Sequence, residues 1–357
     1  MKIAIIGSRG IPAAYGGFET FAEKLALGLI KRAHEVTVVN DRPSKTNPLV
    51  QGVELKFSVY RKQANPLRYY RDSVSLVKDG YDVILCCGVG GAMFFSTTKT
   101  PVVTNVDGLE HLRTKYSPAK RLFVKWLQKK AAARSTFLVA DSVYVQQYWQ
   151  EKYRIPQNKI STITYGTDFP ETTLVLPENY ELTKNGYYLV VARFVPENNL
   201  EMIIDGFVKS NTSKKLVLVG RSEESRYMKK LETWKDPRII FAGTVYDQKK
   251  LQSLRMNSFA YIHGHSVGGT NPSLVEAMGA SNACICFDNV FNREVTGDRQ
   301  QYFNSAEKLS LCIEQIEGNA ELHQAMKSEA FLRAREHYNW EKIIDEYEAV
   351  FRRIVGQ

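Results

Sequence analysis

Two series of short apolar segments alternate with helical segments, and this alternation limits the possible fold more than any other feature of the chain. The first series comprises residues 2–6, 36–40, 53–60, 83–87, 102–106 and 137–140. The second comprises residues 187–192, 215–220, 238–243, 260–264 and 283–287. Strands that are apolar on both faces are typical of a parallel sheet covered by helices on both sides. The sequence therefore predicts an α/β protein with two Rossmann-like sheets.

The length and one polar stretch predict where the chain divides. A chain of 357 residues exceeds the usual size of a single core. Residues 166–185 contain two prolines and little helical periodicity, as linkers do. We predict an N-terminal domain over residues 1–168 and a C-terminal domain over residues 169–338. A final helix over residues 339–357 should pack back on the N-terminal domain through an apolar stripe of Trp340, Ile344, Tyr347, Phe351 and Ile354.

The positive charge of the chain is concentrated in its first half. Residues 1–170 contain 25 Lys and Arg against 13 Asp and Glu, and the remainder contains 23 against 25. Such a surface suits an anionic partner, which is nucleic acid or anionic lipid. Recognition-helix and RNA-binding motifs are missing from the sequence, so we expect no nucleic acid partner.

A basic segment with aromatic residues favours lipid. Residues 111–134 contain eight Lys and Arg, with Leu122, Phe123, Trp126 and Leu127 interleaved at helical spacing. A basic amphipathic helix with a tryptophan is typical of helices that lie on anionic membranes. The same combination recurs in Tyr60, Arg61, Lys62, Leu67, Arg68, Tyr69, Tyr70 and Arg71. The alternative for either segment is a solvated face over the core.

The remaining compositional features predict a cytoplasmic protein at the inner face of the membrane. The five cysteines lie mostly in strand-like apolar runs, as buried thiols of a reducing compartment do. The first ten residues run directly into a strand and a glycine turn, without the pattern of a signal peptide. The longest apolar run, residues 83–95, is shorter than the ~20 residues that span a bilayer.

A glycine-rich turn follows the first predicted strand. Gly7 and Gly10 lie in the turn, and Gly16 and Gly17 open the next helix, where free amides and the helix dipole favour phosphate. A dinucleotide-binding turn would need G-x-G-x-x-G and an acidic residue about 20 positions later, and this spacing differs. A purely structural turn is the other alternative.

Two further motifs follow strands of the second series. Arg193 comes directly after the first of these strands, at the edge where open parallel sheets bind ligands, and its guanidinium matches a diphosphate. Residues 263–278 form a strand end, a loop of small residues and a helix start, with Glu276 one turn into the helix. Such a loop can offer amides to phosphate, and Glu276 can accept hydrogen bonds from ribose hydroxyls.

At these places the chain resembles glycosyltransferase family four, whose members have the GT-B fold with the active site between two Rossmann-like domains. The resemblance extends to residues 140–142, 165–168, 219–220 and 241–245. The segments GSRGIPAAYGGFE, NVDGLE and GGTNPSLVEAM are most similar to bacterial β-1,4-rhamnosyltransferases of surface polysaccharide synthesis.

The resemblance implies roles for individual residues. It assigns Gly16 and Gly17 to the donor phosphate or sugar, Arg193 to the pyrophosphate and Glu276 to the ribose. Backbone amides of Gly269, Thr270 and Asn271 would contact the donor, and Val245 with Arg221 would lie at the nucleobase. We expect the acceptor to contact Tyr15, Glu19, Asp107 and Glu110.

Three positions depart from the family pattern. Asn198 stands where the family has a basic residue, Gly268 replaces the first glutamate of a pair, and Asp107 stands where many members have a histidine. We keep Asn198 among the donor-binding residues. A nucleotide-sugar epimerase of the same fold and a catalytically weakened nucleotide-sugar-binding subunit are alternative functions.

The expected chemistry is glycosyl transfer without a metal or other cofactor, from a nucleotide diphosphate sugar to a lipid-linked saccharide. The chain contains no D-x-D motif, so a divalent ion is not expected to balance the charge of the departing diphosphate. Arg193 and helix N-termini can take that role, with Glu276 beside them. The resemblance implies retention of anomeric configuration, in which Asp107 orients the acceptor or steadies the cationic sugar. In an inverting reaction, Asp107 would be the general base.

Overall fold

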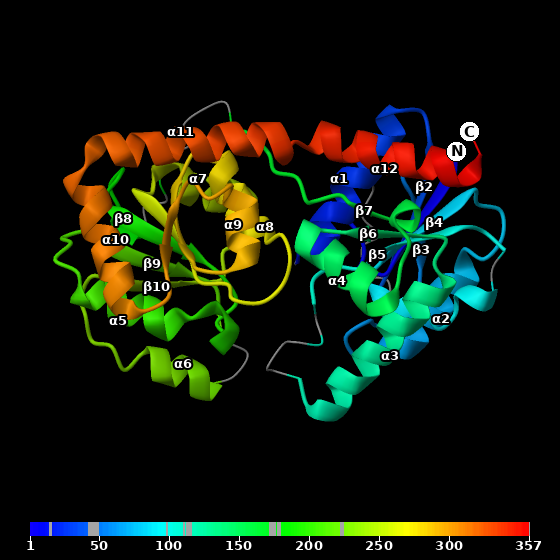
Figure 1. Cartoon of the computed structure of the whole chain (residues 1–357), viewed down its shortest axis with the longest axis horizontal. Coiled ribbons are helices and arrows are strands. Elements are labelled where there is room, and N and C mark those ends of the chain that lie inside the picture. Colours follow the sequence, from blue (N-terminus) through cyan, green and yellow to red (C-terminus); the bar gives the residue numbers. More distant parts are fainter. Residues whose placement is uncertain are drawn as a thin grey trace. The chain divides into compact units, whose positions relative to one another are not determined.

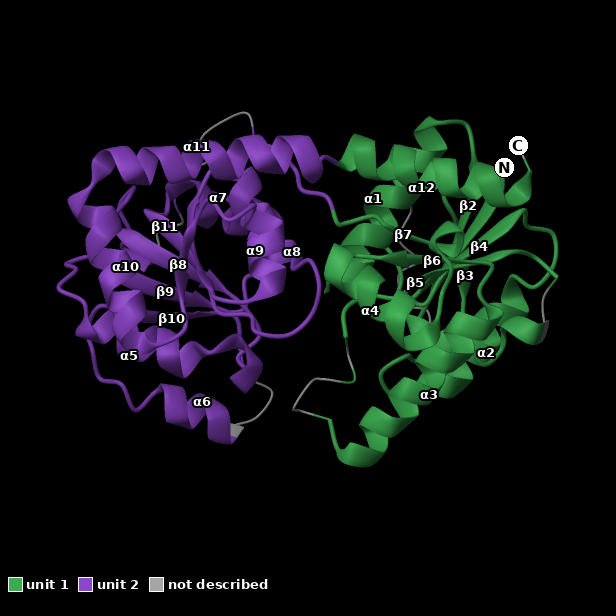
Figure 2. Ribbon diagram, in the orientation of Figure 1, with its two compact units in different colours: residues 1–165, 340–357 green, residues 166–339 purple. Residues whose placement is uncertain are grey.

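The structure is a computed structural model that describes residues 1–13, 16–41, 50–97, 99–109, 111, 116–170, 176, 180–221 and 225–356. The chain forms two compact units. Unit 1 contains residues 1–165 and 340–357, and unit 2 contains residues 166–339 (Figure 2). Each unit is built around its own parallel sheet (Figure 1).

Unit 1 contains a seven-stranded sheet in which all neighbouring strands are parallel. Its order is β3-β2-β1-β4-β5-β6-β7. The strands are β1 (Lys2–Ile6), β2 (Glu35–Asn40), β3 (Glu54–Phe57), β4 (Val83–Cys87), β5 (Val102–Asn105), β6 (Phe137–Ala140) and β7 (Ile160–Thr162).

The helices of unit 1 cover this sheet. They are α1 (Gly17–Lys31), α2 (Pro66–Leu76), α3 (Pro118–Arg134), α4 (Val143–Tyr153) and α12 (Trp340–Val355), with short 3-10 turns η1 (Val89–Gly91), η2 (Phe95–Thr97) and η4 (Gln157–Lys159). In α1, Phe21, Leu25 and Leu29 recur at helical spacing and are fully buried against the sheet.

The final helix α12 packs on α1 within unit 1. Its residues Ile344, Tyr347 and Phe351 are buried in the same core cluster as the inner face of α1. The two helices approach closely because Gly28 has no side chain: a Cβ there would overlap the side chain of Ile344. Around this contact, Arg32 pairs with Asp345 at 2.5 Å.

Unit 2 contains a six-stranded parallel sheet in the order β10-β9-β8-β11-β12-β13. The strands are β8 (Tyr187–Val191), β9 (Lys215–Val219), β10 (Ile239–Gly243), β11 (Ala260–His263), β12 (Ala283–Phe287) and β13 (Gln301–Phe303). The helices are α5 (Leu200–Lys209), α6 (Ser225–Leu231), α7 (Gln248–Asn257), α8 (Pro272–Gly279), α9 (Val290–Thr296), α10 (Ala306–Gly318) and α11 (Ala320–His337), with the 3-10 turn η6 (Pro196–Asn198). Separate apolar clusters fill the two faces of the sheet.

The chain enters and leaves unit 2 at adjacent points. The amide of Thr167 donates to the carbonyl of Tyr338 at 2.8 Å, and Thr167 forms a parallel bridge with Asn339. Residues 166–168, which the sequence analysis places in the N-terminal domain, therefore lie in unit 2.

The predicted two-sheet α/β class is confirmed, and so are all eleven predicted strands. The structure adds β7 and β13, which the sequence analysis missed. Each is only three residues long and lies at an edge of its sheet, so neither produces the apolar run by which the longer strands were recognised.

All five cysteines are buried and free of disulfides. Burial raises the pKa of Cys86 to about 12, so this thiol is protonated at neutral pH. Within the described part of the chain, no helix combines the length and the apolarity needed to cross a membrane.

Candidate functional site

Those predicted residues of unit 1 that the structure describes lie beyond the carboxyl ends of two strands of its sheet. The glycine-rich loop follows β1, and Asp107 follows β5. Strand β4 pairs with both, so the three strands end side by side at one edge. Parallel sheets bind ligands at this edge.

The glycine-rich loop is fixed by buried contacts on several sides. The amide of Ile11 donates to Asn40 Oδ1 at 3.1 Å, and Asn40 Nδ2 donates to the Ile11 carbonyl at 2.7 Å. Gly10 has φ +114° and lies against Asn40, so a side chain there would overlap that amide. Gly7 likewise lies against the backbone of Cys87, which lets the loop pass close to the end of β4.

Two residues that we assigned to a second membrane-binding segment hold this loop instead. The hydroxyl of Tyr69 donates to the Ser8 carbonyl at 2.5 Å, and the ammonium of Lys62 donates to the Gly7 carbonyl. Tyr69 and Tyr70 are buried on α2, so they contribute nothing to an exposed surface. That interpretation of residues 60–71 was wrong for these residues, because a basic-aromatic composition does not distinguish a surface patch from a loop support.

Glu19, predicted to contact the acceptor, is engaged within the loop. Its Oε1 accepts hydrogen bonds from the Arg9 backbone amide at 2.8 Å and from Arg9 Nε at 3.2 Å. The carboxylate is mostly buried and also fills the space where a side chain at Gly16 would lie. Gly16 and Gly17 stand at the start of α1, with Gly16 at φ +110°. Glu19 therefore acts on the loop conformation.

Asp107 is half-buried, and its backbone has the left-handed φ of +54°. Its amide donates to Asn105 Oδ1 at 3.0 Å, and the hydroxyl of Tyr165 donates to Asp107 Oδ1 at 3.3 Å. Burial, reinforced by the neighbouring carboxylate of Asp107, raises the pKa of Tyr165 well above its usual range. Tyr165 is therefore a neutral phenol that donates to the aspartate.

The predicted residues of unit 2 come from the carboxyl ends of four neighbouring strands. Val245 follows β10, Arg221 follows β9, Arg193 follows β8, and residues 264–271 follow β11. These strands are adjacent and parallel in that order. The sheet thereby brings to one edge residues that are up to 78 positions apart in the chain.

The side chains of Arg193 and Arg221 are exposed at this edge. Among the residues that the structure describes, no carboxylate pairs with the Arg193 guanidinium. An exposed cation on a sheet edge, with its fork of donors unused, can bind an anionic ligand. Val245 is half-buried and packs against the apolar cluster on one face of the sheet.

Asn198 connects the loop after β8 to the loop after β11. Its Nδ2 donates to the Arg193 carbonyl at 2.6 Å, and its Oδ1 lies 2.8 Å from His265 Nδ1. Because the amide nitrogen of Asn198 donates to the Arg193 carbonyl, its oxygen faces the imidazole. His265 Nδ1 therefore carries a proton and donates to that oxygen. Asn198 is buried, and its side-chain amide holds the loop that carries Arg193 in place.

Gly268, Gly269, Thr270 and Asn271 lead into α8. Gly268 has φ +134°, and a Cβ there would lie 3.1 Å from His265 Nε2, so glycine accommodates the imidazole. Asn271 is the N-cap of α8: its Oδ1 accepts from the Ser273 amide at 3.0 Å. The Asn271 side chain thus caps the helix. The predicted contact with the donor would be made by the backbone amide of Asn271.

Glu276 lies in α8 and forms an ion pair with Arg255 of α7. Arg255 has 2% of its side chain exposed and Glu276 has 29%. The buried guanidinium thereby holds one carboxylate oxygen in place, and the partly exposed carboxylate can accept further hydrogen bonds. Sequence analysis missed Arg255, because nothing in the sequence relates it to Glu276 before the two helices pack.

Tyr15 and Glu110, predicted to contact the acceptor, lie outside the described residues, as do Arg113 and Lys115 of the basic segment. Within the described ranges, no three His, Cys, Asp or Glu side chains gather as the ligands of a metal ion do.

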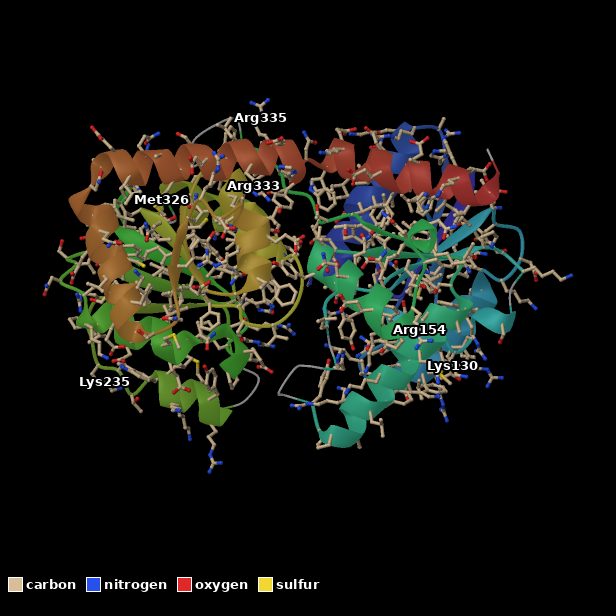
Figure 3. The ribbon with its side chains drawn as sticks, in the orientation of Figure 1. Lys130, Arg154, Lys235, Met326, Arg333 and Arg335 are labelled. Atoms are coloured by element: carbon tan, nitrogen blue, oxygen red, sulfur yellow. The ribbon has the colours of Figure 1, made fainter. Side chains whose placement is uncertain are left out.

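The basic segment forms α3, which begins at Pro118 after the N-cap Ser117. Val124, Leu127 and Ala131 are buried, whereas Leu122 is 70% exposed and Phe123 and Trp126 are each 40% exposed. Phe123 and Trp126 stack with ring centroids 5.8 Å apart. Lys130, labelled in Figure 3, lies with its ammonium 5.3 Å from the Trp126 ring centroid. Leu127 faces the core, contrary to its place in the predicted lipid-facing stripe.

Comparisons with known proteins agree with this architecture. Residues 15–169 match the model of Glycosyltransferase Family 4, and residues 176–333 match that of Glycosyl transferases group 1. An uncharacterized glycosyltransferase of Methanocaldococcus jannaschii is 27% identical over 176 residues, which cover 46% of this chain and 45% of that protein. The chain thus matches less than half the length of this relative.

Solved structures show the same fold. Sucrose-phosphate synthase from Thermosynechococcus elongatus superposes with a TM-score of 0.80 at 14% identity, covering 99% of both chains. HepE of Anabaena, solved in complex with UDP and glucose, has a TM-score of 0.75 at 17% identity and covers 98% of this chain and 99% of that one. With a family 4 domain followed by a group 1 domain, each on its own Rossmann-like sheet, the chain belongs to the family 4 glycosyltransferases of GT-B fold.

Proposed function

We propose that the protein is a retaining, metal-independent hexosyltransferase that moves a sugar from a nucleotide diphosphate to a lipid-diphosphate-linked saccharide. The observation that carries the proposal is the exposed guanidinium of Arg193 at the sheet edge of unit 2, beside the ordered loop that leads to Glu276. A cation with unused donors suits the two phosphates of the donor. The group 1 domain, and the UDP held by HepE, support a nucleotide sugar as the ligand.

Unit 2 supplies a donor site from strand ends. Arg193 binds the pyrophosphate, backbone amides of residues 269–271 contact it at the start of α8, and Glu276 accepts from the ribose. Val245 and Arg221 lie at the next two strand ends along the sheet, where the nucleobase would pack. Asn198 acts through the loop, because its amide is occupied by the Arg193 carbonyl and His265.

In the proposed step, the bond between the anomeric carbon and the diphosphate oxygen breaks, and a bond from the acceptor oxygen to that carbon forms. The acceptor proton passes to the departing phosphate. Arg193 and the amides stabilise the charge that develops on the diphosphate. Asp107 orients the acceptor hydroxyl or steadies the cationic sugar, and the backbone of Gly16 and Gly17 contacts the donor phosphate or sugar at the start of α1.

The sugar is L-rhamnose from dTDP-rhamnose in this proposal, and the product belongs to a bacterial surface polysaccharide. This part rests on the three segments GSRGIPAAYGGFE, NVDGLE and GGTNPSLVEAM, which resemble those of β-1,4-rhamnosyltransferases. In unit 2, His265 bonds to Asn198 and lies against Gly268, so the two positions that depart from the family pattern share this neighbour.

We place the enzyme at the inner face of the cell membrane, in the cytoplasm, docked by α3. Three apolar side chains are exposed on this helix among basic ones, and a helix of this kind inserts its aromatic residues at the level of the headgroups. Anionic lipid complements the surplus of 25 Lys and Arg over 13 Asp and Glu in residues 1–170. A lipid-linked acceptor would lie at the same membrane surface.

The decisive experiment is a screen of nucleotide sugars, with dTDP-rhamnose first, against synthetic lipid-diphosphate saccharides. Mass spectrometry identifies the product, and NMR gives the anomeric configuration of the new linkage. Turnover that requires the acceptor supports a transferase, whereas conversion of the nucleotide sugar alone identifies an epimerase. Binding of donors without any turnover would identify a binding subunit and would refute the proposal.

A further inference from the structure

The backbone at Asp107 adopts a conformation that most residues avoid. Its φ of +54° is left-handed, which is unfavourable for a residue other than glycine. The preceding residue, Val106, still pairs with β6, since its amide donates to the Val139 carbonyl at 2.8 Å. The chain therefore turns sharply at Asp107, and contacts around it must maintain that turn.

The side chain of Asn105 maintains the turn. Its Oδ1 accepts from the Asp107 amide at 3.0 Å, and its Nδ2 donates to the hydroxyl of Tyr347 at 2.9 Å. An amide N–H is only a donor, so the oxygen of Asn105 must face Asp107 and its nitrogen must face Tyr347. Asn105 is fully buried, so leaving its amide unpaired would be costly.

Tyr347 belongs to α12, more than 230 residues after Asp107 in the chain. It is fully buried and packs against Phe21 with ring centroids 5.2 Å apart. Phe21 also packs on Tyr165, the residue that donates to the Asp107 carboxylate. The same aromatic cluster thus supports Asp107 through its backbone and through its side chain.

We infer that Tyr347 and Asn105 are positioning residues for Asp107, so that the docking of α12 on unit 1 sets the geometry of the reactive carboxylate. This inference rests on the proposed role of Asp107 in transfer. The final helix, α12, would then affect catalysis. The chain returns to unit 1 through this helix after unit 2, and the helix also supports the residue that we expect to contact the acceptor. A packing role alone would not need the hydroxyl of Tyr347, which here accepts from Asn105.

The test compares Tyr347→Phe with Tyr81→Phe. Tyr81 is also buried in unit 1, and its hydroxyl also bonds to a side chain: it donates to Thr37 Oγ1 at 3.1 Å, whereas the Tyr347 hydroxyl accepts from Asn105. With the donor and acceptor identified by the screen, Tyr347→Phe should lower kcat about 10-fold without changing the Kd of the donor nucleotide. Tyr81→Phe should leave kcat within about twofold, and both variants should lose similar thermal stability. Equal kcat values in the two variants would refute the inference.

A double-mutant cycle separates this inference from the role of Asp107. If Tyr347 acts through Asp107, adding Tyr347→Phe to Asp107→Asn should lower kcat no further than Asp107→Asn alone. An equal 10-fold loss in both backgrounds would show that Tyr347 acts elsewhere. If Asp107→Asn itself retains full turnover, the proposed role of Asp107 is wrong. The cycle thereby distinguishes a failure of that role from a failure of the inference about Tyr347.

Two further measurements keep the test independent of activity and of folding. Amide hydrogen exchange at residues 105–109 should accelerate in Tyr347→Phe and not in Tyr81→Phe, because the Asn105 amide would lose its anchor. Asn105→Asp keeps an acceptor for the Asp107 amide and accepts from Tyr347, but it adds a charge beside the carboxylate. The acid limb of the pH–rate profile should therefore move to higher pH. Unchanged exchange and an unchanged profile would both contradict the inference.

Discussion

The guanidinium of Arg255 holds the carboxylate of Glu276 in unit 2. The guanidinium is buried, and the carboxylate is partly exposed beside the ordered loop after β11. Glu276 therefore has a structural contact and a predicted ligand contact at once. Its substitution tests both.

Replacing Glu276 by alanine should destabilise the protein as well as weaken donor binding. It leaves the Arg255 charge buried without a partner, which costs about 3 kcal/mol. The double variant Arg255→Met, Glu276→Leu should recover most of that stability but not the binding. Denaturant unfolding and calorimetric titration with dTDP measure the two effects. Recovery of nucleotide affinity in the double variant would remove Glu276 from the donor site.

Replacing Asp107 by asparagine should cut turnover far more than donor binding, by about 100-fold or more in kcat. The amide keeps the size of the side chain and can still accept from Tyr165, so the fold should persist. Steady-state kinetics with the identified substrates and the Kd of the donor separate the two quantities. Equal turnover in the variant and the parent protein would remove Asp107 from the mechanism.

Arg193→Ala should weaken binding of a nucleoside diphosphate about 10- to 100-fold, because a charge-assisted hydrogen bond contributes about 1.5–3 kcal/mol. Arg193→Lys should recover only part of the lost affinity, since an ammonium lacks the planar pair of N–H donors of a guanidinium. Arg335→Ala is the matched control: this exposed arginine lies on α11 of the same unit (Figure 3). A loss of affinity equal to that of the control would show that Arg193 does not bind the diphosphate.

Replacing Phe123 and Trp126 together by serine should weaken binding to anionic vesicles about 10- to 100-fold, because two exposed aromatic side chains would no longer insert. Leu332→Ser is the control, since Leu332 is 63% exposed on α11. Flotation with vesicles containing phosphatidylserine, at low and at high salt, measures the effect. Binding that ignores salt, or no binding by the parent protein, would refute docking through α3.

Unfolding of unit 2 should become easier below about pH 6.5 because of His263. Burial, with a smaller contribution from His265, lowers the pKa of His263 well below its ordinary value of 6.5. The unfolded chain therefore binds a proton that the folded chain does not. As the pH drops below 6.5, the free energy of unfolding decreases, by at most ~1.4 kcal/mol per pH unit. Urea unfolding from pH 8 to pH 5 should give a shallower slope for His263→Gln than for the control His337→Gln, whose side chain is 40% exposed. Identical slopes would contradict the assignment.

The positions of the longer strands along the chain were predictable because they depend on local composition. Each long strand is a run of apolar residues, and Gly7, Gly16 and Gly17 mark the turn at which the first strand passes into a helix. The positions of Arg193, Arg221 and Val245 at one edge also followed, since each comes directly after a strand and parallel strands end at the same edge.

The partners of these residues were not predictable. Composition alone placed Tyr69 and Lys62 on a membrane surface, yet both bind the loop carbonyls of unit 1. Leu127 has the spacing of the exposed stripe of α3 but faces the core. Each contact depends on how a helix is rotated against its sheet, which the periodicity of a short basic segment does not determine.

The sequence by itself determined that the chain forms two parallel α/β sheets with a glycine-rich turn after the first strand and an arginine after the first strand of the second sheet. These properties are encoded in residues close together in the chain. Only the tertiary structure decided that Arg255 holds Glu276, that Asn198 binds His265 and that Tyr347 supports Asp107 through Asn105. The bonded residues are 21, 67 and 242 positions apart and lie on different elements. Hydrogen bonds between buried groups form only where packing brings a donor to an acceptor.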